Sequence, residues 1–373
     1  MKRVLIDARM VERIPHGIGV YVADLARSLQ AIANKPYQPV FILKRSLAME
    51  LRSQSPWKDV ECVLADSSFL SPSEWLELPK LLRREDAALY HSPSFASLPR
   101  CPVPWVQTVH DLNHLKYGGL FERLYYRTLL KPFVRGARSL VSISEFARNE
   151  LRDWLGNPAF PVELVANVIE DRSAAIAGFS AEKVDALLSR FGVARRRYLL
   201  CVSNPKPHKN LRFLVEAYLE ARRQDPKALE DFPLLLTVSS DALGVSGPGV
   251  KCVGAVSSDE VSVLMRECGV FAFPSLYEGF GRPPAEAVAM GAPVLVSDIP
   301  PHREGLAGVA ASAVSFLSPD SNQSWVEAIL RAAQGEIPRP SEKDAHWVTE
   351  SFSLSRMGKG MDRVYRAVLG LNS

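Results

Sequence analysis

Short apolar runs rich in β-branched and aromatic residues alternate along the chain with longer amphipathic segments. In the first half these runs predict strands over 3–7, 39–43, 60–64, 88–91, 105–109, 139–143 and 162–165. The segments between them carry the apolar spacing of helices, over 19–33, 72–84, 120–137 and 144–155. Such alternation is typical of a parallel sheet covered by helices on both faces.

The same alternation starts again after 166–196, a stretch without strand signal in which 181–191 has a helical pattern. The later strands are predicted over 198–202, 233–238, 250–253, 269–273, 293–297 and 313–316. Helices are predicted over 209–223, 258–267, 283–290, 321–334 and 355–369. The restart predicts two α/β domains of the doubly wound kind. Because such sheets bind ligands beyond the carboxyl ends of their strands, we expect a site in a cleft between the domains.

Length and composition are consistent with this organisation. The chain has 373 residues, of which 47% are hydrophobic and 23% charged, as in a globular protein with sizeable cores. No apolar run approaches the roughly 18–20 residues that span a bilayer, and Asp7 interrupts the first apolar run, so we expect a cytoplasmic protein. The five cysteines form no Cys-x-x-Cys pair, which indicates neither a disulfide framework nor a zinc site.

The net charge of +4 is concentrated in one segment of the first half. Residues 113–138 contain a single acid, Glu122, and six basic residues, Lys116, Arg123, Arg127, Lys131, Arg135 and Arg138. Their spacing predicts a basic arc of about 120° on one helix. Two interpretations stay open: a solvated face above a buried apolar stripe, or docking of 116–138 to an anionic membrane. In the second half, Arg195-Arg196-Arg197 has no interleaved aromatic residues and belongs to no wider basic stripe, so we expect no nucleic-acid partner.

The most distinctive stretch follows the predicted strand 269–273. It reads Tyr277-Glu278-Gly279-Phe280-Gly281-Arg282-Pro283-Pro284-Ala285-Glu286. The two glycines allow close approach of the backbone to a ligand, and a helix that begins at the prolines offers its N-terminus to a phosphate. Two carboxylates beside an anion site suit a ligand that also carries hydroxyl groups, such as a sugar and a ribose.

The Glu-x7-Glu spacing of this stretch resembles the retaining nucleotide-sugar glycosyltransferases of GT-B architecture, glycosyltransferase family four, also called group 1 and rich in mannosyltransferases. Other segments resemble motifs of the same family in the same order. They are Gly17-Ile18-Gly19-Val20-Tyr21, Val109-His110-Asp111-Leu112, Ser142-Ile143-Ser144-Glu145-Phe146, Pro207-His208-Lys209-Asn210-Leu211 and Gly254-Ala255-Val256.

The resemblance implies two Rossmann-like domains. The acceptor side would occupy 1–170, with 354–373 crossing back to it, 171–196 would be a linker, and 197–353 would bind the nucleotide-sugar donor. The implied reaction moves a hexose, with mannose and hence GDP-mannose favoured, to a hydroxyl of a glycan or a lipid-linked acceptor. We expect it to serve cell-surface polysaccharide assembly, in the cytoplasm or at the inner face of the membrane. No cofactor and no metal are expected, since the chain lacks an Asp-x-Asp motif.

The resemblance also implies roles for individual residues. His110 would contact the transferred sugar, and Asp111 would orient the histidine or meet the acceptor. Lys209 would neutralise the leaving diphosphate, Glu278 would bind the sugar hydroxyls and Glu286 the ribose. The other expected donor-binding residues are Gly17, Gly19, Ser203, Val253, Gly254, Gly279, Phe280, Gly281 and Arg282.

Two positions depart from the family's pattern. Ser203 stands where many members carry arginine, and Arg282 stands where an apolar residue is usual, so Arg282 either supplies the missing cation or points to solvent. Three other functions stay open: a sugar-nucleotide epimerase of the same architecture, a bilobal sugar-binding protein, and a non-catalytic partner subunit of a glycosyltransferase complex.

Overall fold

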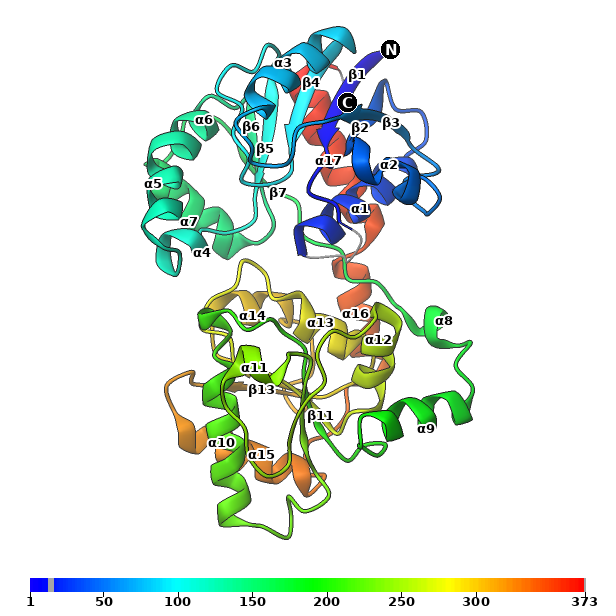
Figure 1. The fold of residues 1–373 in the computed structure, drawn as a ribbon, viewed down its shortest axis with the longest axis vertical. Coiled ribbons are helices and arrows are strands. Elements are labelled where there is room, and N and C mark those ends of the chain that lie inside the picture. Colours follow the sequence, from blue (N-terminus) through cyan, green and yellow to red (C-terminus); the bar gives the residue numbers. More distant parts are fainter. Residues whose placement is uncertain (13–16, 372–373) are drawn as a thin grey trace. The chain divides into compact units, whose positions relative to one another are not determined.

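The structure, a computed structural model, describes residues 1–12 and 17–371. It divides into two compact units, each with its own parallel sheet (Figure 1). Unit 1 comprises Met1–Val168 and Phe352–Ser373, and unit 2 comprises Ile169–Ser351. No helix in the described part of the chain is both long and apolar enough to cross a bilayer.

Unit 1 is built on a seven-stranded parallel sheet of order β3-β2-β1-β4-β5-β6-β7. The strands are β1 (Lys2–Asp7), β2 (Tyr37–Lys44), β3 (Glu61–Ala65), β4 (Ala87–Ser92), β5 (Trp105–Val109), β6 (Ser139–Ser142) and β7 (Val162–Leu164). The sequence predicts all seven of them. From β1 the chain winds outward through β2 and β3 and then returns to β4 on the other side of β1. The topological switch point of this sheet therefore lies between β1 and β4.

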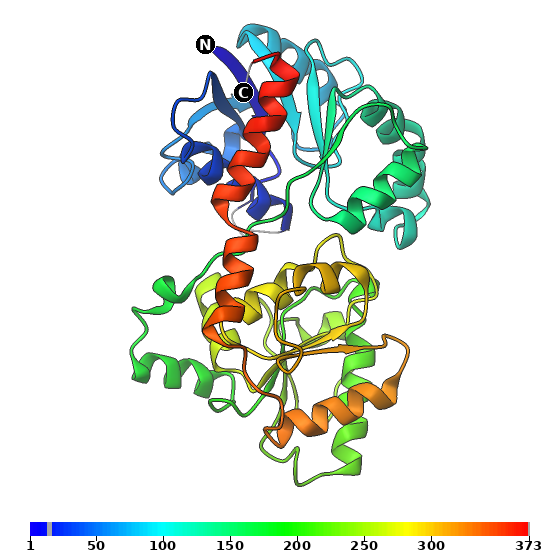
Figure 2. The same cartoon turned by 180° about the vertical axis from the view of Figure 1, so that it is seen from behind.

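The helices of unit 1 include one from the end of the chain. They are α1 (Gly17–Gln30), α2 (Arg45–Leu51), α3 (Glu74–Arg84), α4 (Asn113–Lys116), α5 (Leu120–Tyr125), α6 (Lys131–Arg135), α7 (Glu145–Leu155) and α17 (Leu354–Leu369). Figure 2 shows α17 running along the sheet of unit 1, and it packs on α1 and β4. A Cβ at Gly358 would lie 2.7 Å from the backbone oxygen of Ser28, so glycine permits the close approach of the two helices.

The helix predicted over 120–137 is not one regular helix. Between α5 and α6 the chain forms a π-helical turn, η1 (Tyr126–Leu130), which widens the helix and shifts the direction of the side chains that follow. The regular helical repeat from which the basic arc is predicted therefore does not hold through this segment, although Arg123, Arg127 and Arg135 are all exposed. Two leucines of this segment, Leu124 and Leu129, are 53% and 37% exposed and so belong to no buried stripe.

Unit 2 contains a six-stranded parallel sheet of order β10-β9-β8-β11-β12-β13. Its strands are β8 (Leu199–Cys201), β9 (Leu234–Leu236), β10 (Val250–Cys252), β11 (Val270–Phe273), β12 (Val294–Ser297) and β13 (Val314–Leu317). The sequence predicts all six. Here the order reverses between β8 and β11, because the chain winds outward through β9 and β10 before it returns to β11.

The helices of unit 2 cover both faces of its sheet. They are α8 (Ser173–Ile176), α9 (Ala181–Arg190), the 3-10 turn η2 (Pro207–Lys209), α10 (Leu211–Gln224), α11 (Ser240–Leu243), α12 (Ser258–Glu267), α13 (Arg282–Ala289), α14 (Pro300–Gly305), α15 (Asn322–Ala333) and α16 (Glu342–Ser351). Helices α10 and α15 pack together over one face, where Tyr218 and Trp325 are fully buried.

The segment 171–196, expected as a linker, is part of unit 2. Its helices α8 and α9 pack on α12. Val184, Leu187 and Leu188 of α9 are buried, because their helical spacing gives α9 an apolar stripe that needs a neighbour.

Candidate functional site

Most residues of unit 2 that the sequence singles out follow the two strands at the switch point of its sheet. Strand β8 leads into the turn that carries Lys209, and the neighbouring strand β11 leads into the loop 274–281. Parallel neighbours end at the same edge, so the two loops lie side by side. The backbone N–H of Leu276 donates to the carbonyl oxygen of His208 at 2.8 Å and joins them.

Lys209 and Glu278 form an ion pair across this switch point. The ammonium Nζ donates to Oε1 of Glu278 at 2.6 Å, and the two side chains are only 14% and 11% exposed. The same Nζ lies 5.4 Å from the ring centre of Phe273, the last residue of β11. The lysine that the sequence assigns to a phosphate is therefore held by the carboxylate that the sequence assigns to sugar hydroxyls.

Helix α13 begins at the glycine loop, and its first turn carries a second ion pair. Gly281 is the N-cap, with a left-handed φ of 85° that glycine adopts without strain. Nε of Arg282 donates to Oε1 of Glu286, one turn later, at 3.2 Å. Arg282 therefore does not simply point to solvent, and its guanidinium lies beside the carboxylate expected to bind a ribose.

A buried histidine that the sequence analysis misses lies beneath the glycine loop. His302 of α14 is 1% exposed, and its Nδ1–H donates to the carbonyl oxygen of Ser297 at 2.7 Å. Its Nε2 is buried without a hydrogen-bond partner, and burial lowers the pKa of the imidazole. A Cβ at Gly281 would lie 2.8 Å from Cδ2 of this ring, so the loop rests on a neutral imidazole. The signal available in the sequence is its position just after β12, the next strand of the sheet.

Three other predicted donor-binding residues follow β8 and β10. The N–H of Ser203 donates to Oγ1 of Thr237 at 3.3 Å. The N–H groups of Val253 and Gly254 donate to carbonyl oxygens at the end of β9 and just beyond it, at 2.9 and 3.1 Å. Both N–H groups are thus bonded within the protein. A Cβ at Gly254 would meet no atom within 4 Å, which leaves open space beside the loop.

In unit 1 the structure brings His110 beside the first glycine segment. Gly17 and Gly19 lie in the first turn of α1, and Tyr21 of the same helix packs edge-on against the His110 ring, with centroids 4.7 Å apart. Nε2–H of His110 donates to the carbonyl oxygen of Pro93 at 2.8 Å, which leaves Nδ1 as the basic nitrogen. Burial lowers the pKa of His110 to about 4, so the ring is neutral at neutral pH.

Asp111 has a local structural contact. Its Oδ1 accepts the backbone N–H of Asn113 at 2.9 Å, at the start of α4. This contact is the ordinary turn-forming role of an aspartate that follows a strand.

A chain of buried polar groups runs below His110. The hydroxyl of Tyr21 lies 3.3 Å from Oγ1 of Thr108, which lies 2.9 Å from Nε2 of His91. Nδ1 of His91 is 2.6 Å from the hydroxyl of Tyr365 on α17. Burial lowers the pKa of His91 to about 3, so this histidine is neutral. Nothing in the sequence pattern marks His91, which occupies an ordinary position of a buried strand.

Metal binding finds no support in the ranges 1–12 and 17–371. No group of three or more histidine, cysteine, aspartate or glutamate side chains there is arranged to hold an ion. Metal-independent chemistry stays a prediction.

Two family models match the chain, one after the other. "Glycosyltransferase Family 4" matches residues 15–172, and "Glycosyl transferases group 1" matches residues 196–334. The serotype-specific mannosyltransferase WbdA of Escherichia coli is 30% identical over 227 residues, which cover 56% of this chain and 27% of that protein. The O-antigen chain mannosyltransferase RfbU of Salmonella typhimurium is 25% identical over 239 residues, 61% of this chain and 60% of that protein. The match thus spans about a quarter of WbdA and three fifths of RfbU.

Solved structures share the fold of the whole chain. Sucrose-phosphate synthase from Thermosynechococcus elongatus has a TM-score of 0.73 at 16% identity, with 99% of this chain and all of that chain covered. Anabaena HepE in complex with UDP and glucose has a TM-score of 0.69 at 15% identity, with 98% and 100% covered. At these identities the likeness concerns the fold, and the predicted GT-B class with two parallel-sheet domains is confirmed.

The contact between Gly281 and His302 predicts a stability effect. Gly281→Ala should lower the free energy of unfolding by about 1–3 kcal/mol through backbone strain alone. The new methyl group would also press on the His302 ring, so we expect the total loss to be larger. Gly291→Ala is a matched control, since φ is 76° there and the nearest atom to a Cβ is 3.9 Å away. Denaturant unfolding compares the two. Equal losses would show that the ring does not support the loop.

His91 predicts acid sensitivity of unit 1. Its folded pKa of about 3 lies below the ordinary value of 6.5, so the unfolded chain binds the proton more readily. The contribution to stability is therefore complete above pH 6.5 and is lost as the pH falls toward 3. Between pH 7 and pH 5 the free energy of unfolding should therefore fall by about 2 kcal/mol through this histidine.

The test is denaturant unfolding of wild-type protein and His91→Asn at both pH values. The variant should be less stable at pH 7 and should show a pH dependence smaller by about that amount. An unchanged pH dependence would contradict the burial of a neutral imidazole.

Proposed function

Because the chain belongs to the group 1 glycosyltransferases of family four, we propose that it transfers a hexose from a nucleoside diphosphate sugar to a hydroxyl of a glycan or lipid-linked acceptor. The names of WbdA and RfbU as mannosyltransferases support mannose as the sugar, with GDP-mannose as donor. The name of RfbU, an O-antigen chain mannosyltransferase, supports a role in cell-surface polysaccharide assembly. HepE, seen with UDP and glucose, supports a nucleotide donor.

The observation that carries this proposal is the pairing of cations and carboxylates at the switch point of unit 2. Lys209 and Glu278 join the loops after β8 and β11, and Arg282 and Glu286 form the first turn of α13. A nucleoside diphosphate sugar offers both kinds of partner at once. Its phosphates attract the cations, and its hydroxyl groups donate to the carboxylates.

Donor binding then replaces each ion pair with contacts to the ligand. In the proposed complex Glu278 accepts from hydroxyls of the sugar, Glu286 from the ribose, and Lys209 turns to the diphosphate. Arg282 provides the second cation in this proposal, because Ser203 carries no charge. The backbones of Gly279, Phe280 and Gly281 approach the sugar and diphosphate, and those of Val253 and Gly254 hold the base.

We propose that departure of the diphosphate is helped electrostatically and without metal. As the bond from the anomeric carbon to the phosphate oxygen breaks, negative charge grows on the diphosphate. Lys209 and the N-terminus of α13 are preorganised to stabilise that charge. The acceptor hydroxyl attacks from the same face of the sugar and gives its proton to the departing diphosphate oxygen, so that the anomeric configuration is retained.

Unit 1 is proposed to serve the acceptor side. His110 presents a neutral imidazole to the transferred sugar, held in place by Pro93 and Tyr21. Asp111 stands beside it with a fixed carboxylate. Gly17 and Gly19 let the start of α1 come near the donor. The proposed place of action is the cytoplasmic face of the membrane, with segment 116–138 toward the lipid.

Donor binding is tested by thermal shift with a panel of nucleoside diphosphate sugars in the presence of EDTA. We expect GDP-mannose at 100 times its Kd to stabilise the protein by about 2.7 kcal/mol. Lys209→Ala should lose most of this effect, and its kcat should fall by about 10²–10³ if Lys209 acts like other preorganised charges. Lys206→Ala is the matched control, an exposed lysine three residues earlier in the same loop.

Two results would overturn the proposal. One is the absence of stabilisation by every nucleotide sugar of the panel. The other is equal behaviour of the Lys206 and Lys209 variants. Turnover that requires added Mg²⁺ or Mn²⁺ would remove its metal-independent part.

A further inference from the structure

A surface hollow in unit 1 is lined in part by segment 116–138 and by none of the residues proposed to bind the donor or the transferred sugar. Its volume is about 290 Å³, near the lower end of the range for small-molecule sites. It lies between α5 and the loop that precedes α3. Most of its lining is aromatic or aliphatic, from Leu70, Phe95, Phe121, Tyr125 and Tyr126.

Two polar side chains, His114 and Glu122, complete the lining, and Glu122 is exposed to solvent. The two tyrosine hydroxyls have partners within the protein. The hydroxyl of Tyr125 donates to the carbonyl oxygen of Phe95 at 2.9 Å. The hydroxyl of Tyr126 is hydrogen bonded to Nδ1 of His114 at 3.0 Å. The hollow thus offers mainly carbon to a ligand. A glycan would leave its hydroxyl groups without partners there, whereas a hydrocarbon chain has none to satisfy.

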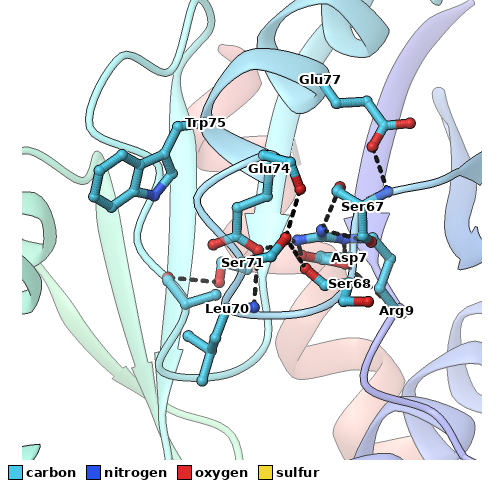
Figure 3. Close-up of polar contacts among 12 residues, drawn as sticks. Asp7, Arg9, Ser67, Ser68, Leu70, Ser71, Glu74, Trp75 and Glu77 are labelled. Atoms are coloured by element: carbon cyan, nitrogen blue, oxygen red, sulfur yellow. Dashed lines mark hydrogen bonds and ion pairs between the residues drawn. The ribbon is translucent and has the colours of Figure 1, made fainter.

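One wall of the hollow is held in a strained conformation by a buried ion cluster (Figure 3). Leu70 has a left-handed φ of 60°, rare for a residue other than glycine, and its N–H donates to Oε2 of Glu74 at 3.0 Å. The same carboxylate oxygen accepts from Nη2 of Arg9 at 2.9 Å, and Arg9 also bonds Asp7. The side chains of Arg9 and Asp7 are completely buried.

The start of the same loop is also held by a carboxylate. Glu77 accepts the backbone N–H groups of Asp66 and Ser67 at 2.7 and 2.6 Å. Strain of this kind persists where the surrounding structure enforces it, and it gathers at functional positions. Here the result is a leucine side chain fixed at the mouth of an apolar hollow, 43% exposed.

Helix α5 and the turn after it expose apolar side chains beside two arginines and one acid, Glu122. Leu120 and Phe121 of α5 are 80% and 86% exposed, and Leu124 is more than half exposed. Arg123 and Arg127 lie between and after them and are exposed as well. Large apolar side chains gathered in this way mark an interaction surface. Interspersed arginines add attraction to a surface that is both anionic and apolar, as the interface of an anionic bilayer is.

We propose that this face of unit 1 inserts into an anionic phospholipid bilayer, and that the hollow receives a segment of a lipid hydrocarbon chain. Phe121 and Leu120 enter the bilayer interface, and Leu70 contacts the hydrocarbon chain in the hollow. Arg123 and Arg127 bind the phosphate headgroups. This inference extends the proposed function. It depends on that function in one respect only, namely that membrane insertion would bring the site to a lipid-linked acceptor. It replaces a purely electrostatic contact by one with a hydrocarbon component.

Sedimentation with phosphatidylcholine vesicles that contain phosphatidylglycerol separates the two components, since salt screens only the charges. We expect Phe121→Gln with Leu124→Gln to bind roughly tenfold more weakly at low and at high salt. Arg123→Gln with Arg127→Gln should bind more weakly at low salt only. Met49→Gln on α2 removes an equally exposed apolar side chain, 93% exposed, and should bind like the wild type.

Insertion itself is tested with lipids brominated along the acyl chain, which quench tryptophan fluorescence. Phe121→Trp should be quenched more than the parent protein, which already contains six tryptophans. Absence of extra quenching, or wild-type vesicle binding by the apolar double variant, would overturn the inference. So would a dimer in lipid-free solution that this double variant dissociates, because the face would then join two copies of the chain.

The outcome is independent of donor binding. Each variant is checked for stabilisation by nucleotide sugar, which reports on unit 2 and on folding. Failure of vesicle binding with intact donor stabilisation would remove this inference and leave the proposed function standing. Vesicle binding without any stabilisation by nucleotide sugars would remove the proposed function and leave the membrane inference standing.

Discussion

The ion pair between Lys209 and Glu278 joins the two loops on which the whole site of unit 2 is built. The sheet order places these loops side by side after β8 and β11, and the pair fixes their distance. Because both side chains are nearly buried, the loss of either partner would leave a poorly solvated charge. A ligand that enters must therefore supply a new partner for each charge that it separates. A diphosphate linked to a sugar does so. A ligand that separates Arg282 from Glu286 must likewise supply a partner for each of them.

Unit 1 depends on buried polar groups of another kind. The chain from Tyr365 through His91 and Thr108 to Tyr21 ties α17 and α1 to the centre of the sheet, directly below His110. Since these groups are neutral, they fix position without offering charge. The charged cluster of Arg9 lies instead at the end of β1, where it holds the loop around Leu70. The two arrangements place a neutral histidine after β5 and a rigid loop around Leu70 after β3.

The strands could be predicted almost completely, because buried parallel strands appear as continuous apolar runs such as Val270-Phe271-Ala272-Phe273. The π turn at Tyr126–Leu130 could not, since it changes the helical repeat without changing the kinds of residue. The gathering of Lys209, Glu278 and Glu286 followed from their positions after neighbouring strands. Their ion pairs did not, because the sequence gives no side-chain directions. His302 and His91 could not be predicted, because neither lies in a motif. Their role follows from burial, which the sequence does not show directly.

The central claim is that Lys209 changes its partner from Glu278 to a diphosphate. Titration calorimetry with a nucleoside diphosphate that lacks the sugar isolates this step, because Glu278 then gains nothing from the ligand. Glu278→Gln keeps the shape of the side chain but no longer holds the ammonium by charge. We predict that this variant binds the nucleoside diphosphate roughly tenfold more tightly than the wild type, although it transfers sugar more slowly. Equal or weaker binding by the variant would contradict the exchange.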